Sequence, residues 1–131
     1  QPPVDALKWA EQLVFVYPTW LYGPPAMLKG WLERVWLPGV AFLPPPAKGK
    51  PAVPGLRHIR RLTVVTTGGA PWWWLKVMGD PGRKLFVRGL RALFARNCRT
   101  IWLQLHNMNN VSRDECAAFL ARVSRTLGAI T

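Results

Sequence analysis

Two short segments combine turn residues with aromatic side chains. The first is Pro18-Thr19-Trp20-Leu21-Tyr22-Gly23, and the second is Thr66-Thr67-Gly68-Gly69-Ala70-Pro71. A flat aromatic ligand needs apolar walls on its faces and backbone amides at its edge, and loops of this composition supply both. Turn glycines are common and tryptophans often only pack, so each loop taken alone is equally compatible with a structural role.

Both segments follow apolar runs of strand length. Residues 13–17 form a continuous apolar run closed by Pro18, and residues 62–67 form a β-branched run cut off by Gly68. These runs predict two strands buried on both faces, and residues 100–105 predict a third. Because ligands of open parallel sheets bind outside the carboxyl ends of the strands, both loops are expected at the binding edge.

Helical patterns alternate with these strands. Leu28, Trp31, Leu32 and Val35 repeat at i, i+3, i+4, i+7 after Pro25, which predicts a helix. Residues 83–97 predict an amphipathic helix with Phe86, Leu90, Leu93 and Phe94 on its apolar face. A capping box of Ser112 and Glu115 begins a last helix, which Gly128 ends and whose apolar positions are Cys116, Phe119, Leu120, Val123 and Leu127.

The remaining stretches are less regular. Residues 4–12 carry mostly helix formers, and the proline-rich residues 43–55 predict a surface loop that reaches toward a partner subunit. The order strand, helix, strand, helix, strand, helix requires right-handed crossovers and predicts an α/β fold with a parallel sheet.

Composition narrows the class of protein. The 131 residues, half of them hydrophobic, are enough for one domain with a core. Cys98 and Cys116 are expected to be buried thiols in a reducing cytoplasm, and His58 and His106 stand too far apart to predict a metal site. The longest uncharged stretch is broken by prolines, so no direct membrane insertion is expected.

The net charge of +12 is compatible with attraction to nucleic acid, acidic lipid or an anionic cofactor. The basic residues do not form one cluster, however. Arg83, Lys84, Arg88 and Arg91 fall along one amphipathic segment, which is typical of a solvated helix face. Because no base-reading motif occurs, we expect no nucleic-acid partner, and an anionic ligand remains the main exception to the solvated-face interpretation.

Longer matches make the sequence specific to one family. Residues 17–35 read YPTWLYGPPAMLKGWLERV, residues 38–42 read PGVAF, and residues 66–72 read TTGGAPW. Together these strings resemble the signature of the flavodoxin-like NAD(P)H dehydrogenase (quinone) family.

The resemblance implies a flavodoxin-like three-layer sandwich with a parallel sheet. Residues 1–131 would form the C-terminal part of a single such domain, with the first strands and the phosphate-binding loop missing, because no Gly-rich or Ser-rich phosphate loop precedes any helix. In the strand order 2-1-3-4-5, the strand at residues 13–17 would then expose an apolar edge. We hypothesise an incomplete gene model or half of a split protein, which binds flavin weakly alone.

The resemblance also implies a cofactor and a reaction. FAD or FMN would bind through its ring, and NAD(P)H would reduce it before a quinone-like acceptor is reduced in a ping-pong sequence. Glycine suits such a loop because it lets the backbone approach the ring closely. Glu33 corresponds to the family's helix carboxylate, but it could equally pair with Lys29. One edge of the ring would meet Pro18, Thr19, Trp20, Leu21 and Tyr22, and the other Thr66, Thr67, Gly68 and Gly69.

Two family positions depart from the pattern. A tyrosine and a histidine of some members fall on Trp74 and Asp80, so we assign no catalytic residue. Trp72 and Trp74, with Trp73 between them, would form an apolar wall of the acceptor pocket, or equally pack in a core or interface.

The resemblance leaves several alternatives open. It implies a homodimer with the site at the subunit interface, and the runner-up function is a non-catalytic ancillary subunit, for example of a potassium-efflux system. The choice between FMN and FAD remains open, because the discriminating phosphate and adenine contacts lie largely in the missing segment. The choices between NADH and NADPH and among physiological acceptors remain open as well.

Overall fold

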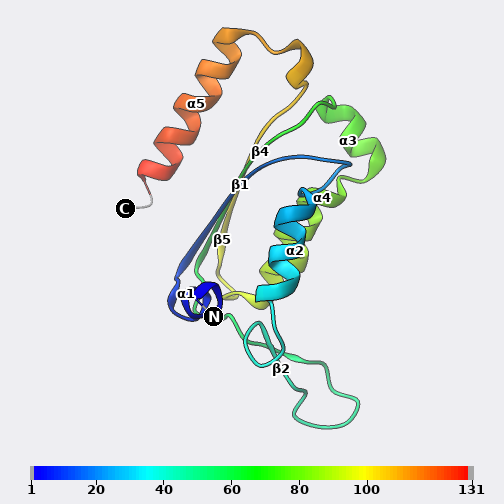
Figure 1. The fold of residues 1–131 in the computed structure, drawn as a ribbon, viewed down its shortest axis with the longest axis vertical. Helices are drawn as coiled ribbons and strands as arrows, with labels where there is room; N and C mark the ends of the chain where they lie inside the picture. Colours follow the sequence, from blue (N-terminus) through cyan, green and yellow to red (C-terminus); the bar gives the residue numbers. More distant parts are fainter. Residues whose placement is uncertain (1, 130–131) are drawn as a thin grey trace.

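A three-stranded parallel sheet organises the computed structural model, which describes residues 2–129 (Figure 1). Its strands are β1 (Gln12–Pro18), β4 (Arg61–Thr67) and β5 (Arg99–Leu105), in the order β1-β4-β5. The strands start in register, with Gln12 beside Arg61 and Arg61 beside Arg99. All three predicted strands and their parallel pairing are therefore confirmed.

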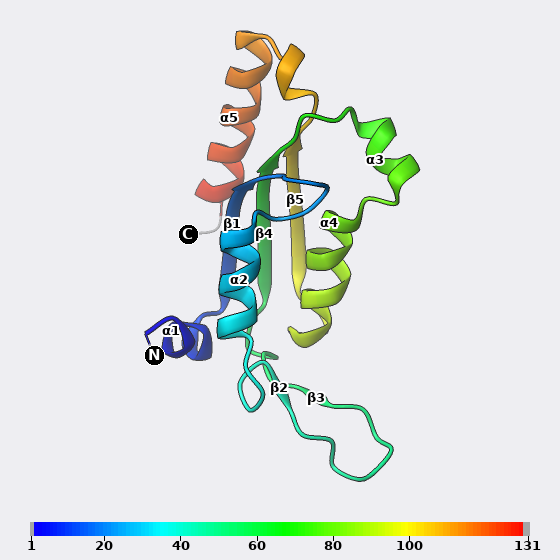
Figure 2. The same ribbon diagram turned by 45° about the vertical axis from the view of Figure 1, so that its right-hand side comes forward.

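Helices cover both faces of this sheet. Figure 2 shows α2 and α4 in front of the strands and α5 behind them, so the predicted three-layer α/β fold is confirmed. The α-helices are α1 (Pro2–Trp9), α2 (Ala26–Val35), α3 (Trp72–Met78), α4 (Pro81–Lys84) and α5 (Arg113–Gly128). Pro25 immediately precedes α2, where its missing amide removes no helical hydrogen bond.

The core lies between the sheet and the layer of α2 and α4. Phe86 is fully buried at its centre, with its ring centroid 5.1 Å from that of Phe15 and 5.3 Å from that of Tyr17. Trp102 of β5 approaches the same ring at 6.3 Å. One side chain thus joins both outer strands to the helical layer.

The segment after α4 is not the regular helix predicted for residues 83–97. It continues as a π-helical segment, Leu85–Leu90, and a 3₁₀ turn, Arg91–Leu93. Phe94 is then extended, and the amide of Ala95 donates to the carbonyl of Ile59 instead of continuing the helix. Apolar periodicity detects the buried face, which includes Phe86 and Phe94, but not a widened turn or a competing backbone partner.

The prediction that the first strand is buried on both faces is wrong. Val14 and Val16 are 45% and 70% exposed, whereas Phe15 and Tyr17, on the opposite face, are buried. Among the described residues β1 is an edge strand, and α5 lies on the same face as the two valines but against β5. The central strand β4 is buried on both faces as predicted.

The last helix confirms its predicted start, and its apolar side is only half covered. The Ser112 hydroxyl accepts from the amide of Glu115 at 3.1 Å, and the Glu115 carboxylate accepts from the amide of Ser112 at 2.8 Å. No residue of α5 is buried, and Leu120 is 66% exposed. Of the two cysteines, only Cys98 is buried as expected, because Cys116 lies on this half-covered helix.

The proline-rich segment is a loop closed by a two-residue ladder. The strands β2 (Phe42–Leu43) and β3 (Val53–Pro54) pair antiparallel at its base. Figure 1 shows the loop extending away from the sheet, at the end opposite α3.

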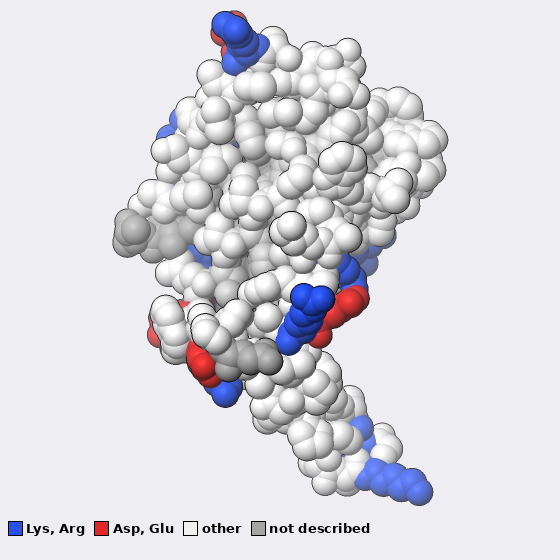
Figure 3. All heavy atoms as spheres, viewed as in Figure 1, with Lys and Arg blue, Asp and Glu red and all other residues white. Residues whose placement is uncertain are grey.

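Charged side chains are spread over the surface. Figure 3 shows one face on which Lys and Arg lie mainly at the margins and along the projecting loop. Glu33 accepts a hydrogen bond from Lys29, which holds the pKa of this exposed carboxyl below its ordinary value. Of the helices in residues 2–129, none has the length and apolar character to cross a bilayer.

Candidate functional site

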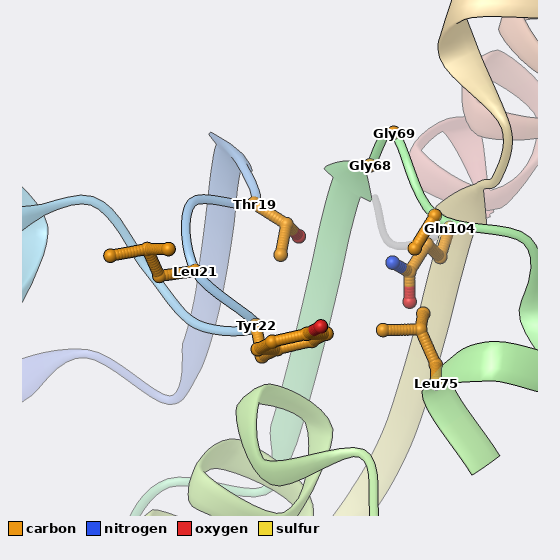
Figure 4. A pocket seen from close by; sticks show the side chains of 8 residues that line it. Thr19, Leu21, Tyr22, Gly68, Gly69, Leu75 and Gln104 are labelled. Carbon is orange, nitrogen blue, oxygen red and sulfur yellow. The ribbon is translucent and has the colours of Figure 1, made fainter. Parts of the chain in front are cut away.

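A hollow of about 210 Å³ opens at the carboxyl ends of the three parallel strands (Figure 4). Parts of both predicted loops meet there, together with the end of β5 and the middle of α3. The hollow is lined by Thr19, Leu21, Tyr22, Gly68, Gly69, Ala70, Leu75 and Gln104.

Hydrogen bonds fix the two loops to each other. The amide of Thr19 donates to the carbonyl of Thr67 at 2.7 Å, and the hydroxyls of Thr19 and Thr66 are 2.8 Å apart. The amide of Gly68 donates to the carbonyl of Leu105 at 3.0 Å. These bonds connect all three strand ends. Thr66 is almost fully buried, so its hydroxyl supports the loops and does not face the hollow.

Other amides at the rim have no partner within residues 2–129. The N–H groups of Gly69 and Ala70 donate no hydrogen bond there, and both residues line the hollow. A Cβ atom on Gly69 would meet only the side-chain nitrogen of Asn109, at 3.8 Å. The backbone here is therefore open to a ligand that offers acceptor atoms along its edge.

Strained backbone gathers around the hollow. In the described chain, four non-glycine residues have positive φ: Leu21 (45°), Tyr22 (67°), Asp80 (47°) and Asn107 (57°). Leu21 and Tyr22 line the hollow, and the amide of Asn107 donates to the carbonyl of Ala70 at 3.2 Å. Such conformations persist only where the surrounding structure enforces them, and they cluster at ligand sites.

The three consecutive tryptophans are the first residues of α3, a helix that the sequence patterns did not predict. In α3, Trp74 donates its indole N–H to the Tyr22 hydroxyl at 3.0 Å, which joins α3 to the first loop. Trp72 is 59% exposed, and its ring centre lies 5.5 Å from the Lys76 ammonium. Neither Trp72 nor Trp74 lines the hollow itself, where Leu75 of the same helix does.

Two further predicted residues lie beside the hollow. Pro18 ends β1 opposite Thr67, in register with it. Trp20 is 66% exposed and lines a shallower neighbouring hollow with Pro24 and Pro25. The predicted set therefore divides into lining residues, residues that hold the loops together, and exposed aromatics at the rim.

Burial shifts the pKa values of two groups near the site. Burial raises the pKa of the Tyr17 hydroxyl far above its ordinary range, and the charge of Asp80 adds to this effect. Burial lowers the pKa of His106, and Asp80 opposes that shift. Tyr17 and His106 are therefore neutral near pH 7.

We expect the free energy of unfolding to fall as the pH is lowered through about 6.5, the ordinary pKa of histidine. In that window His106 binds a proton in the unfolded chain but not in the folded one, because its folded pKa is lowered. Urea titrations at a series of pH values measure this slope. His106→Gln should flatten it, and an unchanged slope in that variant would contradict the assignment.

Pattern reasoning missed Gln104 and Leu75 as lining residues. Gln104 lies next to the end of β5, so the rule that ligands bind at carboxyl ends of parallel strands indicates its position. No comparable sequence signal indicates Leu75. The helix that carries it begins with three tryptophans, which are equally compatible with a pocket wall and with packing in a core or interface.

Similar proteins are known in sequence and in structure. NAD(P)H dehydrogenase [quinone] 1 of Rattus norvegicus is 34% identical over 64 residues, which are 49% of this chain and 22% of the rat protein. The crystal structure of Smu.1420 from Streptococcus mutans UA159 has a TM-score of 0.81 at 23% identity, covering 96% of this chain and 64% of that one. An FMN-dependent NADH-azoreductase from Bacillus anthracis, solved in complex with FMN, has a TM-score of 0.72 at 17% identity, covering 90% of this chain and 54% of that one.

The chain therefore spans less than two thirds of the length of each of these proteins. The structural likenesses show a shared fold. The sequence also matches, over residues 1–125, the family described as having a flavodoxin-like fold. With its parallel sheet, covering helices and match over nearly all of its length, this chain belongs to the flavodoxin-like fold family.

Proposed function

We propose that this chain is the ring-binding part of a flavin-dependent NAD(P)H:quinone oxidoreductase, within a single flavodoxin-like domain. The observation that carries the proposal is the hollow at the strand ends, whose rim holds the uncommitted amides of Gly69 and Ala70. The names of the rat and Bacillus anthracis proteins support the reaction class and a flavin.

The residues present fit the ring of FAD or FMN. Gly69 leaves the backbone accessible, because even an added Cβ atom there would make only one ordinary contact. Tyr22 and Leu75 offer apolar surface, and the amides of Gly69 and Ala70 offer donors for the polar edge of a ring. Thr19, Thr66 and Thr67 would hold the loops at a fixed separation.

When bound, the flavin supplies hydride transfer from NAD(P)H and then to a quinone-like acceptor, in ping-pong order. The chain's own part is to hold the ring edge and to keep the loops in place. Trp74 steadies Tyr22 at the rim, and Trp72 lies outside it, where an acceptor or a second subunit would contact it.

A homodimer and a cytoplasmic location belong to the same proposal. Large apolar side chains are exposed around the site, as expected where a second subunit covers it. Two free cysteines fit a reducing compartment. The exposed apolar side chains include Trp20, Leu21, Met27, Trp72 and Val77.

Titration of the 131-residue chain with FMN tests the proposal, with tryptophan and flavin fluorescence as readouts. We expect saturable binding that is weak compared with a complete flavoenzyme. The loaded chain should then oxidise NADH or NADPH in the presence of a simple quinone. A folded chain that binds no flavin would refute the proposal and favour the non-catalytic ancillary role.

Thr19→Val should weaken FMN binding severalfold and lower the free energy of unfolding by about 1–2 kcal/mol, because it leaves the buried Thr66 hydroxyl without this partner. The matched control is Thr126→Val in α5, which also removes a hydroxyl hydrogen bond, to the carbonyl of Arg122. The control should bind FMN as the wild type does. Equal FMN affinity in all three chains would show that the loop contact does not shape the site.

A further inference from the structure

Gln104 stands in a polar row beneath the hollow. Parallel register places Tyr17, Thr66 and Gln104 side by side across the three strands, so their side chains point to the same face of the sheet. Tyr17 and Thr66 are buried, whereas Gln104 lines the hollow. Of the three, Gln104 is therefore the one whose polar group a ligand can reach.

Trp102 fixes which end of the Gln104 amide faces the hollow. Its indole N–H lies 3.1 Å from the Gln104 side-chain oxygen. An indole N–H can only donate, so it holds the carbonyl oxygen and leaves the two N–H donors of the amide directed elsewhere. Trp102 is itself held by packing against Phe86, at 6.3 Å between ring centres.

The amide nitrogen meets the open face of Gly68. A Cβ atom built on Gly68 would lie 3.2 Å from this nitrogen, a tight contact that glycine avoids. Figure 4 shows the nitrogen on the side of the hollow that faces Thr19, with the oxygen turned away. In the described chain, the amide nitrogen donates to no protein group, although an amide supplies two donors.

We propose that Gln104 is a specificity-determining residue, which donates a hydrogen bond to an acceptor atom on the edge of a flat heterocycle bound in the hollow, and that Trp102 is its positioning residue. This inference rests on the proposed function and deepens it. The acceptor atom belongs either to the flavin ring or to the carbonyl of a quinone-like acceptor, and the experiment distinguishes the two.

Riboflavin is the probe for the first arm, because it carries the ring without a phosphate whose charge would disturb the comparison. Gln104→Leu should weaken riboflavin binding about tenfold, the loss of one net hydrogen bond. Gln104→Glu should weaken it further, since a carboxylate lacks a donor, as leucine does, and also places a negative charge against the acceptor atom of the ligand. The matched control is Gln12→Glu at the opposite, exposed end of β1, which should leave riboflavin affinity unchanged.

The second arm measures the KM for a simple quinone in chains saturated with FMN. Raised KM with unchanged riboflavin affinity assigns the bond to the acceptor, and weakened riboflavin affinity assigns it to the flavin. Trp102→Phe in the wild type should change the same quantity as Gln104→Leu, riboflavin affinity or quinone KM, but by less. In a Gln104→Leu background it should cause no further change. A merely structural role of Trp102 would instead change that quantity in both backgrounds.

The outcomes separate this inference from the proposed function. If the wild-type chain binds no flavin, both fail. If it binds riboflavin and neither Gln104 variant changes riboflavin affinity or quinone KM, only the role of Gln104 is overturned. Far-UV circular dichroism confirms folding of each variant, and the two substitutions at Gln104 guard against misfolding of either one.

Discussion

Gly82→Ala is expected to lower the free energy of unfolding by about 3 kcal/mol and to disrupt the hollow. A Cβ atom on Gly82 would lie 2.4 Å from the carbonyl oxygen of Tyr22 and 3.1 Å from the Cα atom of Gly23. Both are backbone atoms, so no side-chain rotation relieves the contact and the loop must move. Because Tyr22 lines the hollow, FMN binding should weaken together with stability. Urea unfolding and FMN titration measure the two effects.

Gly30→Ala is the matched control. Gly30 lies inside α2, and an added Cβ atom there would meet nothing within 4 Å. Since alanine has a higher helix propensity than glycine, the free energy of unfolding of this variant should rise by about 0.5–1 kcal/mol. If Gly82→Ala left the free energy of unfolding and the FMN affinity as high as Gly30→Ala does, α4 would not be packed closely against the first loop.

Phe86→Ala is expected to remove about 4 kcal/mol of stability, within the range measured for buried phenylalanines. Its fully buried ring joins Phe15, Tyr17 and Trp102, so deletion leaves a cavity between the sheet and the helical layer. Thermal unfolding monitored by tryptophan fluorescence checks this. The loss should extend to the site, because Trp102 would lose the packing that holds it beneath Gln104.

Phe119→Ala makes the same deletion on the half-covered helix α5. We expect it to cost about 1 kcal/mol, since less of that ring is removed from water. Comparable losses at positions 86 and 119 would mean that the core is not centred where the structure places it.

The sequence predicted those parts of the fold that are determined by interactions between residues close together in the sequence. The first two strands were identifiable because their apolar and β-branched runs end at Pro18 and Gly68. The start of α5 was identifiable because Ser112 and Glu115 satisfy each other's amides without help from distant residues. The loops of the candidate site were identifiable because glycine permits backbone conformations that other residues avoid and proline fixes φ, so both residue types are typical of turns.

What could not be predicted depends on tertiary contacts. The exposure of Val14 and Val16 depends on which elements cover that face of the sheet. It cannot be predicted from these two residue types alone. The π-helical turn at Leu85–Leu90 depends on packing that apolar periodicity does not register. The end of its strand indicates that Gln104 lies near the binding edge, but its place beside Thr66 and its hydrogen bond with Trp102 depend on strand register and packing.

The topology of the sheet also governs how the chain reaches its folded state. No two of its strands are joined by a hairpin: Gln12 pairs with Arg61, and Arg61 pairs with Arg99. Large loops must close before any strand gains a neighbour within this sheet, and contacts between such distant positions slow folding. Within residues 2–129, β1 pairs only with β4, which leaves the ribosome after it during synthesis. Expression yield should therefore depend on chaperone supply and temperature more than the small size of the chain suggests.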